Sequence, residues 1–266
     1  ALYARPDELG QAFNFEYLQT PWDAQALRRV ITESLETANA VGASATWVLS
    51  NHDVVRHTSR LMLPPGTDEN AWLLSGGHAP AVDPDAGLRR ARAATLLMLA
   101  LPGSSYVYQG EELGLPEVAD LPTEVLQDPI WEQTGRVRKG RDGCRVPLPW
   151  TTTGPSYGFG PSGAWLPQPP SFAGYSVEAQ DGVEGSTLEL YRTALRLRRK
   201  LLQDETLCWA EETPPGVLQF DRGDGWRCVA NLSGEPVSLP AGEVLLTSAP
   251  LEDGRLGPDT TAWLGR

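Results

Sequence analysis

The chain has 266 residues, of which 41% are hydrophobic, enough for one large domain or for one domain with a small appendage. Its formal net charge of −12 argues against nucleic acid or an anionic membrane as a partner and favours a neutral small-molecule substrate. No apolar run is long enough to cross a bilayer, since the longest, Ala93–Leu101, is short and has helical spacing.

Three cysteines, Cys144, Cys208 and Cys228, are widely spaced and show no metal-ligand pattern. We therefore expect free thiols in a reducing, cytoplasmic compartment, and neither a metal nor a cofactor. The chain starts with Ala1 rather than Met, in the middle of a pattern, which we interpret as a cut end of a longer protein.

Short strands and helices alternate in the first 108 residues. Alternating apolar residues predict a strand at 11–18 (QAFNFEYL), and helical spacing follows at 24–40, with Asp23 as the N-cap. A strand at 46–50, a helix at 86–101 capped by Asp85, and a strand at 104–108 come next. The order strand–helix–strand–helix–strand predicts a parallel α/β sheet.

The remainder of the chain divides into two parts with different sequence patterns. Residues 120–185 show no sustained period, which is typical of a lid or binding loop, and a helix is predicted at 186–202. Beyond residue 204, short strands separated by turn residues predict a small antiparallel β-domain over 204–266. These strands are expected at 207–210, 216–220, 226–231, 236–239, 244–247 and 260–264.

Asn51-His52-Asp53 directly follows the predicted strand 46–50. In α/β barrels, polar residues at the carboxyl ends of the strands form the active site. An imidazole beside a carboxylate can bind a pair of sugar hydroxyls, and Asp53 could stabilise an oxocarbenium-like transition state by its charge. The structural alternative is that Asp53 caps the following turn while His52 is buried beside it.

Metallophosphoesterases use a similar string, Gly-Asn-His-Asp/Glu, at a dinuclear metal site. Here Ser50 precedes Asn51, and His57 and His78 are the only other histidines. Two-metal chemistry needs more ligands than these, so the sequence argues against that reading.

Six segments together resemble one family in content and order. They are FNF at 13–15, WVLSNHD at 47–53, RRARAATLLMLALPG at 89–103, YVYQGEELGL at 106–115, RDGCRVPLPW at 141–150 and LYRTALRLRRKLL at 190–202. The chain thus resembles the C-terminal half of an actinobacterial-type α-glucosidase of the α-amylase family of glycoside hydrolases. The resemblance implies strands 6–8 of a TIM (β/α)8 barrel within 1–203, with a long lid-like loop at 120–185, and a small antiparallel β-sandwich at 204–266.

The resemblance also implies roles for individual residues. Asp53 matches the transition-state-stabilising aspartate, and His52 matches the histidine that binds hydroxyls of the cleaved glucose. Either Arg141 or Arg145 would close the pocket around the non-reducing end, the alternative for both being loop salt bridges. The adjacent Glu111 and Glu112 lie in a segment that the family uses structurally, so we do not expect them to form a catalytic pair.

The implied parent activity is that of an exo-acting, retaining α-glucosidase for maltose-like oligosaccharides or sucrose. Its nucleophilic Asp and general-acid Glu would follow the fourth and fifth barrel strands, which we expect to lie outside this chain. We therefore expect the chain alone to be inactive and marginally stable without the N-terminal half of the barrel. The alternatives are a transglycosylase or trehalose-related enzyme of the same family, and a non-catalytic carbohydrate-binding or partner protein.

Overall fold

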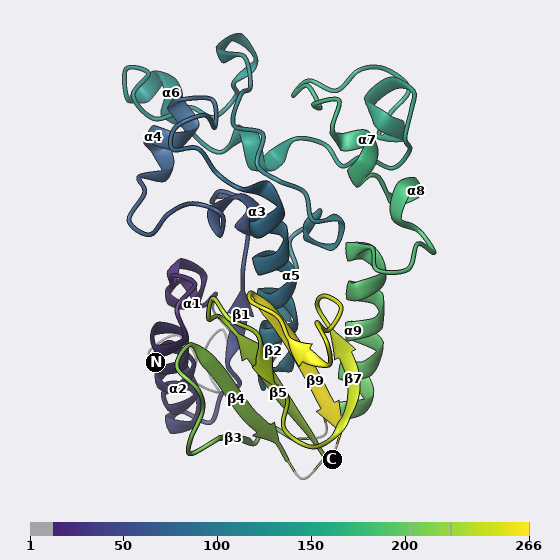
Figure 1. Cartoon of the computed structure of the whole chain (residues 1–266). Coiled ribbons are helices and arrows are strands. Elements are labelled where there is room, and N and C mark those ends of the chain that lie inside the picture. The colour runs from purple at the N-terminus through teal and green to yellow at the C-terminus, as the bar shows by residue number, and fades with distance from the viewer. Residues whose placement is uncertain (1–12, 203, 224, 266) are drawn as a thin grey trace. The chain divides into compact units, whose positions relative to one another are not determined.

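The structure, a computed structural model, describes residues 13–202, 204–223 and 225–265 (Figure 1). The chain divides into two compact units whose segments interleave along the sequence. One unit comprises the residues up to Leu49, Arg89–Tyr106 and the residues from Arg192 onward; the other comprises Ser50–Leu88 and Val107–Tyr191.

In the first unit, α2 (Ala24–Ala40) and a parallel strand pair confirm the predicted α/β elements. The Asp23 side chain accepts a hydrogen bond from the Ala26 backbone N–H at 2.8 Å and so caps α2, as predicted. Strand β1 (Thr46–Val48) pairs in parallel with β2 (Ser104–Tyr106). The two predicted strands therefore do lie side by side, although each is shorter than the sequence indicated.

The prediction of a strand at 11–18, expected to be the sixth barrel strand, is wrong for the residues that the structure describes. Residues 11 and 12 lie outside them, and Phe15–Gln19 form a short helix, α1. The Asn14 side chain accepts a hydrogen bond from the Tyr17 N–H at 2.9 Å, a local cap that favours a helix over an extended chain. Tyr17 and Leu18, adjacent in sequence, are both buried, which breaks the alternation that a half-buried strand requires.

Two longer helices, α5 (Pro84–Ala100) and α9 (Thr187–Leu201), confirm the helices predicted at 86–101 and 186–202. The cap predicted for the first is wrong: the Asp83 side chain, rather than that of Asp85, accepts from the N–H groups at the start of the helix. Placing the cap two residues earlier lets Pro84 occupy the first helical position, where its missing N–H costs nothing.

The first unit also holds a five-stranded antiparallel sheet of order β3-β4-β5-β9-β7 (Figure 1). Its core includes Trp226, Trp263 and Phe220, all fully buried. A separate antiparallel pair, β6–β8, includes one short strand, β8, that the sequence did not predict. The strands are β3 (Leu207–Trp209), β4 (Val217–Arg222), β5 (Trp226–Asn231), β6 (Val237–Ser238), β7 (Glu243–Thr247), β8 (Arg255–Leu256) and β9 (Thr260–Gly265).

The second unit is built from loops and short helices around two apolar clusters. One cluster includes Leu113, Leu148 and Phe172, and the other includes Val55 and Trp72. The short elements are α3 (His57–Arg60), α4 (Glu69–Leu74), η1 (Glu111–Leu113), η2 (Thr123–Val125), α6 (Ile130–Gln133), η3 (Asp142–Arg145), η4 (Pro155–Gly158), α7 (Phe172–Tyr175) and α8 (Val177–Gln180).

Candidate active site

Asn51, His52 and Asp53 form a tight turn in the second unit. The Asn51 side-chain oxygen accepts a hydrogen bond from the Asp53 backbone N–H at 2.8 Å, which fixes the turn. Asn51 is buried, whereas the side chains of His52 and Asp53 are 63% and 45% exposed. The alternative of a buried His52 is therefore excluded.

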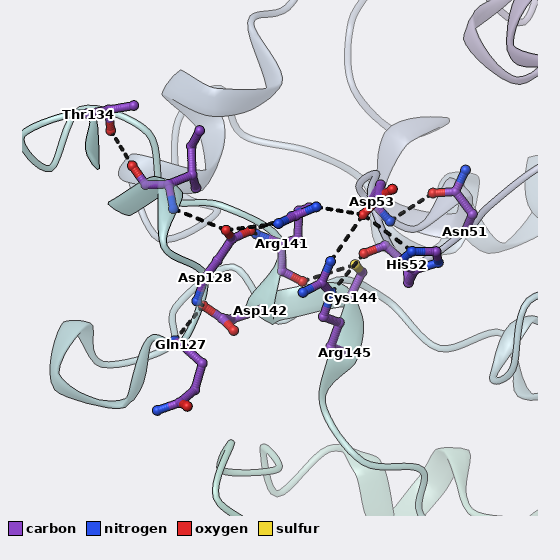
Figure 2. A network of polar contacts seen from close by, with 11 residues as sticks. Asn51, His52, Asp53, Gln127, Asp128, Thr134, Arg141, Asp142, Cys144 and Arg145 are labelled. Atoms are coloured by element: carbon purple, nitrogen blue, oxygen red, sulfur yellow. Dashed lines mark hydrogen bonds and ion pairs between the residues drawn. The ribbon is translucent and has the colours of Figure 1, made fainter. Parts of the chain in front are cut away.

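Three groups converge on a single oxygen, Oδ1 of Asp53 (Figure 2). Arg141 Nη1 lies 2.8 Å from it, Arg145 Nη2 3.1 Å and His52 Nε2 3.5 Å. The structure thus brings together all four residues that the sequence singled out. All three of these contacts are to Oδ1, so within the described part of the chain Oδ2 is the oxygen that can accept a hydrogen bond from a ligand hydroxyl.

Arg141 is anchored from the other side by Asp128. The guanidinium donates to both oxygens of Asp128, through Nε to Oδ2 and through Nη2 to Oδ1 at 3.1 Å, and the Arg141 backbone N–H also donates to Oδ2 at 3.0 Å. These bonds lower the pKa of Asp128 to about 2 and raise the pKa of Arg141. A bidentate pair of this kind fixes the plane of the guanidinium as well as its position.

Asp142 in turn holds the loop that carries Asp128. Its buried carboxylate accepts hydrogen bonds from the backbone N–H groups of Gln127 and Asp128, each at 2.9 Å. Residues 127–128 and 141–142 are therefore tied together by side chain–backbone bonds in both directions (Figure 2). This tie holds Asp128 next to Arg141.

Arg145 is held differently. Its Nε donates to the backbone carbonyl of His52 at 2.8 Å, and its Nη2 contacts Asp53. Because one of these two partners is a carbonyl rather than a carboxylate, Arg145 has a less strongly charged anchor than Arg141. The structure places both arginines on Asp53, and so the choice that the sequence left open between them is not settled by position alone.

Buried Arg56 joins the turn to two other segments. Its Nη1 donates to the Gln109 carbonyl and its Nη2 to the Cys144 carbonyl, both at 2.9 Å, while its backbone N–H donates to Glu117 Oε2 at 3.0 Å. Burial raises the pKa of Glu117 to about 7. Beside these groups lies a cavity of about 460 Å³ whose lining includes Asp53, Glu117, Asp128 and Arg141.

Glu111 and Glu112 do not form a carboxylate pair aimed at a ligand. Glu112 accepts a hydrogen bond from the Gly110 N–H at 2.8 Å, and Glu111 is buried near His57, with 3.9 Å between Oε1 and Nδ1. Burial raises the pKa of Glu111 to about 8 and lowers that of His57 to about 3. Both groups are therefore uncharged at neutral pH, and their proximity is not an ion pair.

Three carboxylates of this region, Glu117, Asp128 and Asp142, were not identified from the sequence. One signal was available for Asp128: it precedes Pro129, and an Asp-Pro step commonly starts a turn. The Asp128 side chain does accept from the Ile130 N–H at 3.1 Å. Nothing in the spacing indicated that the same carboxylate would also bind Arg141.

Across residues 13–202, 204–223 and 225–265, no group of three or more His, Cys, Asp or Glu side chains is arranged to hold a metal ion. No helix within those residues combines the length and the apolar character needed to span a membrane.

Two family models match the chain. The one described as "Alpha amylase, catalytic domain" matches residues 5–205, and one described as "Domain of unknown function (DUF3459)" matches residues 216–263. Among curated proteins, a "Probable alpha-glucosidase" of Rhizobium meliloti (strain 1021) is 37% identical over 198 residues, which is 72% of this chain and 32% of that protein. The "Trehalose synthase/amylase TreS" of Mycobacterium tuberculosis is 31% identical, over 86% of this chain and 40% of that protein.

Solved structures of α-amylase-family enzymes also match the chain. A crystal structure described as the "alpha-glucosyl transfer enzyme, XgtA" is 32% identical, has a TM-score of 0.74, and is matched over 99% of this chain and 48% of its own. Isomaltulose synthase from Erwinia rhapontici NX5, in complex with sucrose, shares the fold at 19% identity and a TM-score of 0.72, over 97% of this chain and 51% of its own. This chain spans about a third of the length of the curated relatives and about half of that of the solved structures.

Proposed function

Because this chain belongs to the α-amylase family of glycoside hydrolases, whose catalytic domain is a TIM barrel, we propose that it supplies part of the active site of an α-glucosidase. The observation that carries the proposal is the convergence of Arg141, Arg145 and His52 on one oxygen of exposed Asp53. A carboxylate that accepts from two guanidinium groups through one oxygen, with an imidazole beside it, can present the other oxygen to a sugar in a fixed orientation.

In this proposal Asp53 stabilises the positive charge that develops on the glucosyl ring in an oxocarbenium-like transition state. His52 binds hydroxyls of the same ring. Arg141 positions Asp53, because the bidentate bond to Asp128 fixes its guanidinium. Arg145 is the arginine that turns to the sugar, because its other partner is the uncharged His52 carbonyl.

We propose that residues 1–203 form the C-terminal portion of the catalytic barrel and residues 204–266 the C-terminal β-domain. The separate family matches at 5–205 and 216–263 support this boundary. Residues 120–185 serve as a lid-like loop, since they carry Arg141 and Arg145 and are ordered by side chain–backbone bonds rather than by long elements.

Retaining hydrolysis needs a nucleophilic carboxylate and a general acid about 5 Å apart. Asp128, the other carboxylate bonded to Arg141, is engaged through both of its oxygens and is poorly suited to attack a sugar. We propose that the nucleophilic Asp and the general-acid Glu come from outside these 266 residues, and that the chain alone does not cleave glucosides. Its partner would be the N-terminal half of the barrel.

The proposed substrate is a neutral α-glucoside, either a maltose-like oligosaccharide or sucrose, cleaved from the non-reducing end with retention. A transglycosylase or trehalose-related enzyme is the second candidate, because relatives described as an α-glucosyl transfer enzyme and as a trehalose synthase match at 32% and 31% identity. The free thiols of Cys144, Cys208 and Cys228 support a reducing, cytoplasmic location.

The test is Asp53→Asn in the enzyme assembled with this chain, assayed by hydrolysis of an aryl α-glucoside. We expect kcat to fall about a thousandfold or more, because the substitution removes the charge that stabilises the transition state. The unfolding midpoint should stay close to that of the parent, since Asp53 is half-exposed. Glu124→Gln, at an exposed position in η2, is the matched control and should retain full activity.

Parent-like turnover by the Asp53→Asn enzyme would refute the role of Asp53. Absence of turnover in the unsubstituted enzyme, together with retained sugar binding, would instead favour a non-catalytic carbohydrate-binding protein.

A further inference from the structure

The backbone carbonyl of Cys144 is a point at which three segments of the second unit meet. It accepts one hydrogen bond from Tyr108 Oη at 3.0 Å and another from Arg56 Nη2 at 2.9 Å. The next residue along the chain is Arg145, whose guanidinium contacts Asp53. None of the roles assigned to the site so far uses the hydroxyl of Tyr108.

Tyr108 and Arg56 also hold each other. The guanidinium carbon of Arg56 lies 5.0 Å from the centroid of the Tyr108 ring, within the range of a cation–π interaction. Arg56 Nη1 donates to the Gln109 carbonyl at 2.9 Å, and the backbone passes close by at Gly110, where a Cβ atom would lie only 2.7 Å from Nη1. Tyr108 is therefore fixed at its ring by the guanidinium and at its hydroxyl by the Cys144 carbonyl.

The Tyr108 hydroxyl acts as a donor to a backbone group directly attached to Arg145. Burial raises the pKa of Tyr108, so the phenol keeps its proton at neutral pH. A carbonyl oxygen has two lone pairs, and the two donors on Cys144 occupy both. This carbonyl shares a planar peptide group with the nitrogen of Arg145. Its orientation therefore sets the direction in which the backbone enters Arg145.

Arg145 depends on its backbone more than Arg141 does. The side chain of Arg141 is fixed by the bidentate bond to Asp128. The side chain of Arg145 bonds to the turn that it serves, through the His52 carbonyl at 2.8 Å and Asp53 at 3.1 Å. A guanidinium that turns from these partners to a sugar must be held in place from its backbone side.

We propose that Tyr108 is a positioning residue for Arg145: through the Cys144 carbonyl, its hydroxyl fixes the backbone from which Arg145 reaches the substrate. The proposal rests on the function proposed above, since it takes Arg145 as the arginine that turns to the sugar. Tyr108 acts through Arg145 and not on the sugar itself. Loss of its hydroxyl should therefore weaken substrate binding more than the chemical step, because Asp53 keeps its bond to Arg141.

The test is Tyr108→Phe in the enzyme assembled with this chain, which removes the hydroxyl and keeps the ring beside Arg56. With an aryl α-glucoside we expect KM to rise about fivefold while kcat stays within about twofold of the parent. In an Arg145→Ala background the same change should alter KM by less than about 1.5-fold, because the side chain that it positions is gone. Tyr175→Phe, the same change at a half-buried tyrosine of the same unit, is the matched control and should behave as the parent.

An unchanged KM in Tyr108→Phe would overturn the proposal, as would an equal rise in both backgrounds or a loss confined to kcat. If the parent enzyme does not cleave the glucoside, the α-glucosidase assignment fails, and a crystal structure of the Tyr108→Phe enzyme then tests the positioning role separately. Arg145 Nη2 should leave Asp53 Oδ1, which lies at 3.1 Å in the parent, whereas Arg141 Nη1 should stay within hydrogen-bond distance of it. An Arg145 that keeps this contact would show that the hydroxyl of Tyr108 does not position it.

Discussion

The five-stranded sheet β3-β4-β5-β9-β7 and the loops around Asp53 are held together by different contacts. The sheet is held by a ladder of backbone hydrogen bonds and by the packing of buried tryptophans. The loops are tied by a few carboxylates and by the guanidinium groups of Arg56 and Arg145, which bond to backbone groups of distant segments. We therefore expect the sheet to lose stability when apolar volume is removed, whereas the site should lose its geometry when a single acceptor is removed.

The largest effect should come from the sheet. Trp263 is fully buried, packs against Trp226 with ring centroids 5.1 Å apart, and donates its indole N–H to the Leu96 carbonyl. We expect Trp263→Ala to lower the free energy of unfolding by about 3–5 kcal/mol. Denaturant unfolding measures this, with Val244→Ala on an exposed position of β7 as the control, expected within about 0.5 kcal/mol of the parent. A loss below about 1 kcal/mol for Trp263→Ala would contradict the role given to the tryptophans.

A smaller effect on stability, but a larger one on geometry, is expected from Asp142→Ala. The substitution leaves the buried N–H of Asp128 and the part-buried N–H of Gln127 without their acceptor, at a cost of about 2–3 kcal/mol. Amide hydrogen exchange at these two residues should become at least about tenfold faster. Asp142→Asn retains one acceptor oxygen and should lie between Ala and the parent. Unchanged exchange in Asp142→Ala would show that the carboxylate does not order the loop.

The smallest effect is a change in pH dependence. Burial raises the pKa of Glu117 to about 7, so the folded state holds a proton more tightly than the unfolded chain does. The stability due to this group is present below its unfolded pKa and is lost as the pH rises from about 4.5 to 7. Glu117→Gln should therefore flatten the decline in stability over that range, by an amount on the order of 2 kcal/mol.

The control for Glu117→Gln is Glu124→Gln, at an exposed position, which should leave the pH profile unchanged. A profile of Glu117→Gln that overlays the parent between pH 4.5 and 8 would count against the burial of a protonated carboxyl group at this position.

The same contrast explains what the sequence could and could not predict. Helix α2 and strands β4, β5 and β9 follow from local periodicity and a local cap, so they were predicted within a few residues. Asp53 and His52 could be predicted as site residues because they follow an apolar run and match a family pattern. Asp128 and Asp142 could not be predicted as site residues. Their hydrogen-bond partners lie 13 to 15 residues away, a separation that no helical or strand periodicity relates.

The α1 segment shows the limit of periodicity within a short window. Residues 11–18 alternate in hydrophobicity, yet the cap at Asn14 turns Phe15–Gln19 into a helix. A pattern of eight residues cannot distinguish a strand from a short helix when a local hydrogen bond favours the latter.

Two buried carboxyl groups alter the electrostatics of the whole molecule. The formal charge of −12 treats Glu111 and Glu117 as ionised, but their pKa values of about 8 and about 7 leave them largely and half protonated at pH 7. These two sites therefore make the folded chain less negative than its composition indicates, by roughly one charge. Unfolding at neutral pH releases protons from them, and in the native state their protonation makes the self-repulsion smaller than it would be with both groups ionised.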